Sequence, residues 1–322
     1  MLRTILAALL ALLVLPSIAE AQRTFDVYIL AGQSNADGRG LESDILDSPL
    51  LDNPSNAIIS YLNPSEIVGG VAVDSGVSSN GFQDLAAGFS VAPGERGESL
   101  DLGVPSGDNY FGLELSFASA IGAATGSTND VAIIKVTRGG TNLRNDWRAP
   151  TAEDPTGGFL YEALIGHVNA SLDQLTEGGN QANVQGFLWH QGESDSGNTT
   201  RINNYPGLFT DLVDGVRDNF GDDIPVVLGE LAPNRGGNTV LFNNTIQTLD
   251  DPNSSDFISG VSVVSSAGLT TPANDLTHFD ANGQIGLGER YASALASTAV
   301  PEPSSLAVLG LLSGVVAIRR RR

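Results

Sequence analysis

Short apolar runs alternate with longer amphipathic segments along most of this chain. Five of the runs are β-branched and apolar on both faces, which is typical of strands in a covered parallel sheet. Their alternation with helices indicates βαβ units and predicts an α/β fold, a three-layer α/β/α sandwich around a mostly parallel five-stranded sheet. The predicted strands are 25–31, 131–137, 184–190, 224–230 and 259–265, and the predicted helices are 112–124, 159–176, 203–219, 239–249 and 282–298.

Residues 41–110 interrupt this rhythm. They are rich in Gly, Ser, Asp, Asn and Pro and show no sustained period. A loop of this length in a compact domain is usually functional or disordered. It begins soon after the first predicted strand, so it is placed to cover the edge where that strand ends; a surface insertion with some irregular strands fits equally well. No repeat or low-complexity linker precedes residue 300, so one domain, 22–299, is the simplest organisation.

Both ends of the chain look like targeting segments. Residues 1–21 begin with a positive charge at Arg3, continue as an apolar run and end in a small-x-small cleavage site at Ala21, the pattern of a signal peptide. Residues 300–322 contain Pro-Glu-Pro, then the apolar run 306–318 and four arginines. That run is short for a spanning helix, which needs roughly 17–25 residues, but a positive cluster behind an apolar segment is typical of a cytoplasmic stop.

The C-terminal pattern resembles the PEP-CTERM sorting signal of certain Gram-negative bacteria. The resemblance implies transient inner-membrane anchoring through 306–318 and processing by an exosortase-type enzyme. It also implies export to the cell surface or the extracellular matrix. On this interpretation residues 300–322 are a sorting signal and are not part of the folded domain.

The chain is strongly acidic and lacks cysteine. Its formal net charge is −21, and residues 22–300 carry 35 acidic and 11 basic side chains. Nucleic-acid binding needs a basic face, so this composition argues against a nucleic-acid partner. The absence of cysteine excludes disulfides, a thiolate metal site and a cysteine nucleophile.

Ser34 is the first candidate for chemistry. It follows the run 25–31 within Gly-Gln-Ser-Asn, at the carboxyl end of a predicted strand, where open α/β sheets bind their ligands. A serine hydroxyl is a poor nucleophile without an adjacent base. His278 follows Asp275 by three residues in a polar turn. There the carboxylate can hold one imidazole nitrogen while the other takes the serine proton.

The chain has two further histidines. His167 lies in the middle of a predicted helix, and we interpret it as structural or exposed. His190 ends a predicted strand, and its i, i+3 spacing to Glu193 raises the alternative of a metal hydrolase. Zinc sites typically need three or four ligands, so two usable histidines without cysteine argue against that alternative.

Acyl transfer also needs hydrogen-bond donors aimed at the developing oxyanion. Candidates are the backbone N–H of Ser34, a backbone N–H of Gly139 or Gly140, and the side-chain amide of Gln191. Each lies just beyond a predicted strand, so all of them can meet at one edge of the sheet. An ordinary strand-to-helix turn would also explain the two glycines, and a solvated loop position would explain the glutamine.

Four sequence blocks occur in a characteristic order. They are Gly-Gln-Ser-Asn at 32–35, Lys-Val-Thr-Arg-Gly-Gly-Thr at 135–141, Trp-His-Gln-Gly-Glu-Ser-Asp at 189–195 and Asp-Leu-Thr-His at 275–278. In this order they resemble the blocks of the SGNH hydrolases, and among these the sialate O-acetylesterase and acetylxylan esterase branch (carbohydrate esterase family 6). The resemblance extends over nearly the whole chain between its two ends.

The resemblance implies a role for each block and no cofactor. Ser34 would be the nucleophile, His278 the base, and Asp275 the group that orients the base. The oxyanion hole would comprise Ser34, Gly139 or Gly140, and Gln191. Supporting residues would be Gln33, Asn35, Glu193 and Trp147, with Glu193 a polar support rather than a second catalytic acid.

Two departures from the family pattern stand beside this resemblance. Phe-Gly-Leu-Glu at 111–114 replaces the usual Gly-Pro-Glu at the start of a helix, and Ala36-Asp37 replaces the usual Met-Ala or Met-Ser. Neither departure replaces one of the residues expected to be catalytic. Asp37 is expected to place an extra carboxylate near the serine, a position from which it can alter substrate choice.

These observations predict an exported serine esterase that removes O-acetyl groups from a carbohydrate by a Ser-His-Asp acyl-enzyme mechanism. An α/β-hydrolase would share the chain order Ser, Asp, His but should show Gly-x-Ser-x-Gly, which the chain lacks. An alternative of another class is a surface carbohydrate-binding or matrix protein that keeps an esterase fold without turnover. The joint presence of Ser34, Asp275, His278 and Gln191 favours the enzyme.

Overall fold

The computed structural model describes residues 22–299 except 54, 66, 69–70, 73–75, 92–108 and 178. The predicted signal peptide, 1–21, and the predicted tail, 300–322, lie outside the described residues. In the described part of the chain, no helix combines the length and the apolar character needed to cross a membrane.

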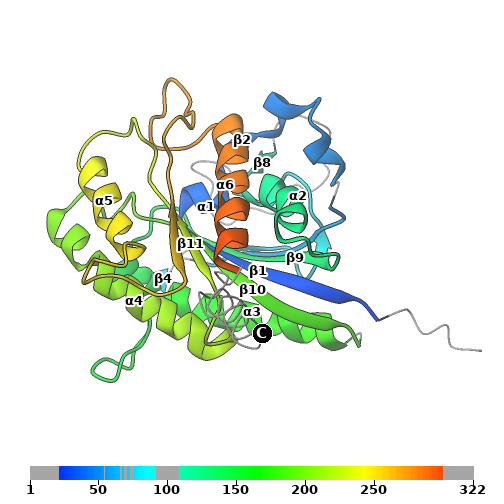
Figure 1. Cartoon of the computed structure of the whole chain (residues 1–322), viewed down its shortest axis with the longest axis horizontal. Helices are drawn as coiled ribbons and strands as arrows, with labels where there is room; N and C mark the ends of the chain where they lie inside the picture. Colours follow the sequence, from blue (N-terminus) through cyan, green and yellow to red (C-terminus); the bar gives the residue numbers. More distant parts are fainter. Residues whose placement is uncertain are drawn as a thin grey trace, which may run out of the picture.

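All five predicted strands form, and they are parallel neighbours in one sheet (Figure 1). They are β1 (Thr24–Gly32), β9 (Asp130–Thr137), β10 (Gln181–His190), β11 (Val226–Gly229) and β12 (Val261–Val264). The predicted α/β fold with a mostly parallel sheet is therefore confirmed.

The sheet is larger than predicted because the segment 41–110 contributes to it. β3 (Ile58–Asn63) pairs in parallel with β9 and gives the order β12-β11-β10-β1-β9-β3-β6. β6 (Val77–Ser78) and β7 (Gln83–Asp84) pair antiparallel with β3, so the described residues form a sheet of eight strands rather than five. The interpretation of 41–110 as a covering loop or surface insertion was wrong for β3, whose Ile59 and Tyr61 are fully buried.

The helices lie close to their predicted positions. They are α2 (Glu114–Thr125), α3 (Phe159–Glu177), α4 (Thr199–Phe220), α5 (Thr239–Ile246) and α6 (Ala281–Ala299). α4 begins earlier than predicted because the Asn198 side chain accepts hydrogen bonds from the backbone N–H groups of Thr200 and Arg201 and caps the helix. Shorter elements are α1 (Ser34–Asp37), the π-helical turn η3 (Leu143–Trp147), the 3₁₀ turns Glu42–Ile45, Pro49–Asp52 and Gln247–Leu249, and the paired strands Gly40–Leu41 with Tyr110–Phe111 and Ile67–Val68 with Val71–Ala72.

Helices cover both faces of the sheet (Figure 1). Alternate residues of β1 point to opposite faces, so Phe25, Val27 and Ile29 join a core cluster with α3, α4 and α5. Tyr28 and Leu30 join a second cluster with α2 and α6. β1 is therefore buried on both faces, which explains its unbroken apolar sequence.

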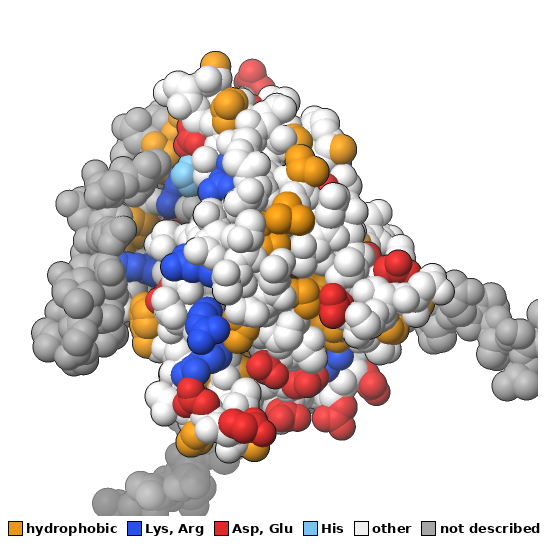
Figure 2. Space-filling model, turned by 90° about the vertical axis from the view of Figure 1, so that its left-hand side faces the viewer, with side chains coloured by type: hydrophobic (Ala, Val, Ile, Leu, Met, Phe, Trp, Pro, Cys, Tyr) orange, Lys and Arg blue, Asp and Glu red, His pale blue; other side chains and the backbone are white. Residues whose placement is uncertain are grey.

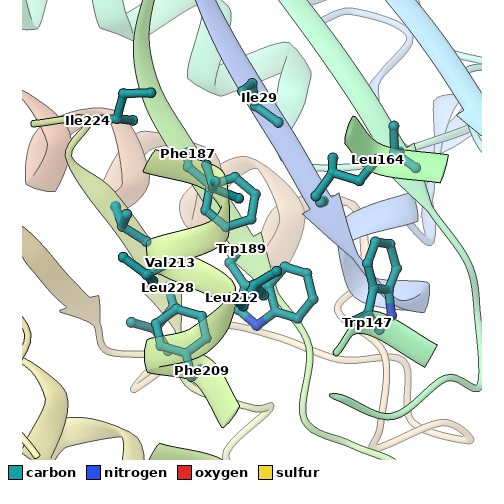
Figure 3. Close-up of a cluster of buried hydrophobic side chains, with 14 of the residues drawn as sticks. Ile29, Trp147, Leu164, Phe187, Trp189, Phe209, Leu212, Val213, Ile224 and Leu228 are labelled. Carbon is teal, nitrogen blue, oxygen red and sulfur yellow. The ribbon is translucent and has the colours of Figure 1, made fainter. Parts of the chain in front are cut away.

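Aromatic side chains fix the end of β10 against α4 (Figure 3). Trp189 of β10 meets Trp147 edge to face with ring centroids 5.2 Å apart, and it also packs on Phe209 of α4. Its indole N–H is donated to the Tyr205 hydroxyl at 3.0 Å. A buried N–H without a partner is costly, so this bond holds the strand end in place.

Three adjacent strands end level with one another at the carboxyl edge of the sheet. Gly32 of β1 is paired with His190 of β10 on one side and with Thr137 of β9 on the other. The segments that follow these strands therefore begin side by side. The chain visits β3 and β9 on one side of β1 and then β10 to β12 on the other, which is the switch point where open α/β sheets bind ligands.

Candidate active site

A tight turn carries the chain from β1 to Ser34. Gly32 has a φ of +142°, and a Cβ atom there would lie 2.1 Å from the His190 carbonyl oxygen, so only glycine fits. The Gln33 N–H donates to the same carbonyl at 3.0 Å. α1 begins at the next residue, which places the Ser34 hydroxyl at the carboxyl edge of the sheet.

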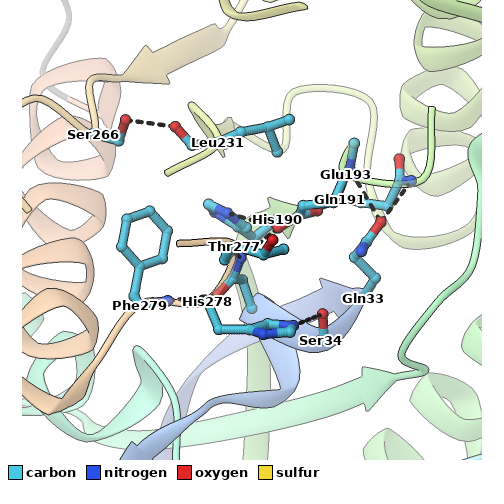
Figure 4. A network of polar contacts seen from close by, with 12 residues as sticks. Gln33, Ser34, His190, Gln191, Glu193, Leu231, Ser266, Thr277, His278 and Phe279 are labelled. Atoms are coloured by element: carbon cyan, nitrogen blue, oxygen red, sulfur yellow. Dashed lines mark hydrogen bonds and ion pairs between the residues drawn. The ribbon is translucent and has the colours of Figure 1, made fainter. Parts of the chain in front are cut away.

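Ser34, His278 and Asp275 form a hydrogen-bonded series, and Figure 4 shows the contact between Ser34 and His278. Ser34 Oγ lies 2.9 Å from His278 Nε2, and His278 Nδ1 lies 2.6 Å from Asp275 Oδ2. A carboxylate only accepts, so Nδ1 carries the ring proton and Nε2 is able to accept from the serine hydroxyl. This is the geometry that a base-activated serine requires.

The Asp275 carboxylate is held in its ionised form. Its Oδ1 accepts from the backbone N–H of Thr277 at 3.0 Å and lies 3.3 Å from that of His278. Burial raises the pKa of the Asp275 carboxyl, but the hydrogen bonds from the His278 ring and the Thr277 N–H outweigh it, so the pKa lies below its ordinary value. The carboxylate is therefore charged at neutral pH.

Asn35 fixes the loop that carries His278. Its buried side chain donates to the Thr277 carbonyl at 3.0 Å and accepts from the Phe279 backbone N–H at 3.0 Å. These two residues flank His278, so α1 holds the loop on both sides of the ring. Asn35 also donates to Glu193 Oε1, which ties in the segment after β10.

The backbone of Gly139 lies against Ser34. A Cβ atom at Gly139 would lie 3.7 Å from Ser34 Cβ, whereas nothing lies within 4 Å of a Cβ at Gly140. Within the described residues, the backbone N–H groups of Ser34 and Gly139 have no hydrogen-bond partner. Gly139 is therefore better placed than Gly140 to donate together with Ser34.

The side-chain amide of Gln191 is occupied by other protein groups (Figure 4). Its Nε2 lies 3.1 Å from Gln33 Oε1, 3.1 Å from the Thr141 carbonyl and 2.6 Å from Asp195 Oδ2. An amide nitrogen carries two hydrogens, and three acceptors already surround this one. The side-chain amide of Gln191 therefore donates to these neighbouring protein groups.

Gln33 supplies an unoccupied amide donor next to Ser34 in the chain. Its Oε1 accepts from Gln191 and lies 3.4 Å from the backbone N–H groups of both Gly192 and Ser194. Three N–H groups around one oxygen fix the orientation of this amide. Its Nε2 has no hydrogen-bond partner among the residues that the structure describes.

Asp195 and Tyr205 orient Gln191, and the sequence pattern assigned neither residue a role. Asp195 is buried and also accepts from the Leu143 backbone N–H at 3.0 Å. Burial raises its pKa, against the hydrogen bonds from Gln191 and Leu143. The Tyr205 hydroxyl lies 3.1 Å from Gln191 Oε1. Asp195 ends a block that sequence analysis singled out, whereas Tyr205 lies in a helix and carries no local signal.

Trp147 belongs to the core rather than to the surface of the site. Its indole N–H donates to Thr141 Oγ1 at 2.9 Å, and the Thr141 carbonyl accepts from Gln191. The tryptophan therefore stabilises the segment after β9 through its hydrogen bond to Thr141.

His190 and Glu193 are buried beneath the site. His190 Nδ1 lies 3.1 Å from the Tyr291 hydroxyl, and its Nε2 lies 4.0 Å from Glu193 Oε1. Burial lowers the pKa of His190, although the charge of Glu193 opposes this, so the ring is neutral. His167 lies 3.1 Å from Ser60 Oγ, within the α3 side of the fold. Across the described ranges, no group of three or more His, Asp or Glu side chains is arranged to hold a metal ion.

Asp37 does not face the serine, contrary to the expectation. It is fully buried and accepts from Tyr61 at 2.6 Å, Thr137 at 2.6 Å and Arg39 Nη1 at 2.8 Å. Burial raises its pKa, but the charges of Arg39 and a neighbouring lysine, with these hydrogen bonds, bring the pKa below its ordinary value. Its physical role is to attach α1 to β3 and β9.

The departure at 111–114 keeps the buried glutamate of that helix start. Glu114 Oε2 lies 3.0 Å from Lys135 Nζ, and its Oε1 accepts from the Gly112 N–H at 2.8 Å. Lys135 Nζ also donates to the Asp37 carbonyl at 2.6 Å. The pair therefore connects α2, β9 and the end of α1.

The family of the chain follows from comparison with known proteins. The model of a family described as carbohydrate esterase, sialic acid-specific acetylesterase, matches residues 94–297. This chain belongs to that family, which confirms the predicted resemblance. The matched range contains Asp275 and His278, and Ser34 precedes it.

The C-terminal sorting signal is confirmed in the same way. Residues 299–322 match the model of the PEP-CTERM protein-sorting motif. This motif indicates export and a surface-associated location in a Gram-negative bacterium. No curated protein matches this chain.

Solved structures share the fold at low sequence identity. A protein from Arabidopsis thaliana has a TM-score of 0.58 and 19% identity, with 84% of this chain and 98% of that chain covered. NanS has a TM-score of 0.55 and 17% identity, covering 86% and 98%. A carbohydrate acetylesterase from Xanthomonas citri has a TM-score of 0.53 and 19% identity, covering 85% of this chain and 56% of the other.

Proposed function

We propose that this protein is an exported serine esterase that removes O-acetyl groups from a carbohydrate by a Ser-His-Asp acyl-enzyme mechanism. One observation carries the proposal: Ser34 Oγ lies 2.9 Å from His278 Nε2, whose Nδ1 lies 2.6 Å from Asp275. Membership of a carbohydrate esterase family supports the reaction class, and one protein of similar structure is a carbohydrate acetylesterase.

In the first half-reaction, Ser34 Oγ attacks the acetyl carbonyl carbon while its proton passes to His278 Nε2. The Asp275 carboxylate stabilises the resulting imidazolium through Nδ1–H. The tetrahedral intermediate then collapses, and the proton on Nε2 moves to the departing sugar oxygen. The products are a free sugar hydroxyl and an acetyl ester on Ser34.

Three donors are assigned to the oxyanion in this proposal. They are the backbone N–H groups of Ser34 and Gly139 and the Nε2 of Gln33, each without a partner in the described residues. Gln191 then acts through Gln33, because its amide holds Gln33 Oε1 at 3.1 Å. Removing one such donor typically lowers the rate about 10²–10³-fold.

In the second half-reaction, water gives a proton to His278 Nε2 and attacks the acetyl-serine carbonyl. Collapse of this intermediate returns the proton to Ser34 Oγ and releases acetic acid, which loses its remaining proton to water and becomes acetate. The cycle uses only protein groups and water.

The proposal extends to the organisation and location of the chain. Residues 1–21 act as a signal peptide, 22–299 form the esterase domain and 300–322 serve as the sorting tail. The run 306–318 anchors the protein transiently in the inner membrane until an exosortase cleaves the tail. The processed enzyme then resides at the cell surface or in the extracellular matrix.

Acetate release by the purified protein tests the proposal. We expect turnover of 4-nitrophenyl acetate and of O-acetylated glycans, and Ser34→Ala should lower kcat by about 10⁴-fold or more. Ser171→Ala is the matched control, because that buried hydroxyl contacts Ser60 and not the triad. Retained turnover in Ser34→Ala would refute the serine as nucleophile. A folded wild type that releases no acetate would favour the binding-protein alternative.

A further inference from the structure

A pocket lies beside the loop that carries His278. It has a volume of about 270 Å³ and is lined by Ser196, Arg235, Asn238, Thr277 and three glycines. Thr277 immediately precedes the base, so the pocket adjoins the acyl site. Asn238 stands at the start of α5 without a side-chain capping hydrogen bond. The lining therefore offers hydroxyl and amide groups suited to a sugar.

Arg235 brings a positive charge to this pocket. Its Nη1 donates to Ser196 Oγ at 2.6 Å and its Nη2 to the Glu193 carbonyl at 2.7 Å. Both acceptors are neutral, and within the described residues no carboxylate forms an ion pair with it. Its Nε is buried without a hydrogen-bond partner there. A guanidinium held only by neutral groups keeps its full attraction for an anion.

Two more arginines, Arg201 and Arg144, add positive charge along the same edge of the sheet. Arg201 Nη1 donates to the Ser194 carbonyl at 3.1 Å. Arg144 is exposed on η3, which is joined to the same turn by the bond from Leu143 to Asp195. Arg144 forms no ion pair in the part of the chain described, whereas the charge of Arg201 acts against burial to lower the pKa of Asp195. Figure 2 shows the side on which β1 and β10 end, where Lys and Arg side chains form a band next to a histidine and acidic side chains gather below.

We propose that the substrate is an anionic polysaccharide, and that the pocket at Arg235 binds the carboxylate of a uronic-acid-type sugar neighbouring the acetylated one. Arg201 and Arg144 contact further acidic sugars along the polymer. This inference rests on the proposed esterase function and adds the chemical class of the substrate.

The charge distribution supports this class of substrate. Residues 22–300 carry 35 acidic and only 11 basic side chains, so the protein as a whole repels a polyanion. Binding an anionic chain then requires a local concentration of cations at the site, which these arginines supply. A neutral acetylated glycan would gain nothing from them.

The test compares two forms of one polymer. O-acetylated polygalacturonate is assayed beside the same preparation with its carboxylates converted to neutral amides. We expect the wild-type kcat/KM to favour the acidic form, and the preference to shrink as salt is raised from 0.05 to 0.5 M because exposed charges are screened. Arg235→Gln and Arg144→Gln should each reduce the preference by up to about fivefold, the upper range for an ion pair at a protein surface.

Arg217→Gln is the matched control. Arg217 also binds two loop carbonyls, those of Ile224 and Ser259, but at the opposite edge of the sheet. Its replacement should leave the preference unchanged. Arg235 also supports the turn after β10, so its replacement removes a structural contact as well as a charge. Arg144→Gln removes the charge alone and therefore tests the electrostatic effect separately. Equal rates on the two polymers in a wild type that hydrolyses 4-nitrophenyl acetate would overturn this inference alone. Absence of turnover on every ester would overturn the esterase proposal itself.

Discussion

Replacing Asn35 with alanine separates the positioning of the base from the chemistry of the triad. The Asn35 side chain bonds the backbone of Thr277 and of Phe279, on either side of His278, and it also donates to Glu193. Alanine removes all three bonds without touching Ser34, His278 or Asp275. We expect Asn35→Ala to lower both stability and turnover.

The magnitude follows from these contacts. Each bond contributes a net stability of about 1 kcal/mol, so the unfolding free energy should fall by about 3 kcal/mol. The loop is then free to move, and a displacement of the ring by about 1 Å is enough to lower kcat about 10²-fold. KM for a small aryl acetate should change little, since Asn35 is fully buried.

Urea unfolding and 4-nitrophenyl acetate hydrolysis measure the two effects. Asn243→Ala is the control, because that side chain binds both the N–H and the carbonyl of Leu231, at 3.0 and 3.2 Å, without contacting the triad. It should lose about 2 kcal/mol of stability and keep its kcat within about twofold. If Asn35→Ala were also destabilised but kept its kcat, the positioning argument would be wrong.

Three further outcomes are expected. Gln33→Ala should lower kcat by about 10²–10³-fold and Gln191→Ala by less than about tenfold; a larger loss in Gln191→Ala would assign the donor to Gln191. Burial lowers the pKa of His190, so below pH 6.5 the unfolded chain takes up a proton that the folded chain does not. The unfolding free energy should thus be highest above pH 6.5 and fall by at most about 1.4 kcal/mol per unit below it; urea unfolding at pH 7.5 and 5.5 should show a smaller loss in His190→Gln. Deleting 301–322 should leave kcat intact and mislocalise the protein in fractionated cells; an inactive truncation would show that the tail belongs to the fold.

The sequence was sufficient for elements whose signal is local. The five strands predicted are apolar on both faces, and helices such as α3 and α6 have a clear apolar stripe. Because parallel strands end at one edge, the meeting of Ser34, Gly139 and Gln191 near His278 also followed. The N-terminal turn of α4 was missed because Asn198 lies in a polar run that is typical of a loop until its capping bonds are seen.

β3 could not be predicted because its burial is a tertiary property. Its six residues include Ser60 and Asn63 and lie within a Gly- and Asp-rich segment, so the short apolar run was hidden in its surroundings. The error about Asp37 has the same origin. Its hydrogen-bond partner Tyr61 comes from β3, and without that strand nothing in the sequence shows which way the carboxylate turns.

Side-chain partners at the site were also beyond the sequence. Whether Gln191 or Gln33 presents a free amide depends on acceptors brought in by other segments, chiefly the Thr141 carbonyl and Asp195. Spacing along the chain places both glutamines at the same edge and does not distinguish them.

The direction of α6 bears on what the proposed esterase would reach while its tail is anchored. α6 begins three residues after His278 and packs Leu295 against Gly186, in the middle of β10. Its 19 residues extend about 28 Å, so α6 carries the chain from the loop of His278 past the middle of β10 and away from Ser34. In the proposed tethered form, Ser34 would therefore lie at the end of the domain remote from the start of the tail, and the enzyme would act on polymers at a distance from its anchor.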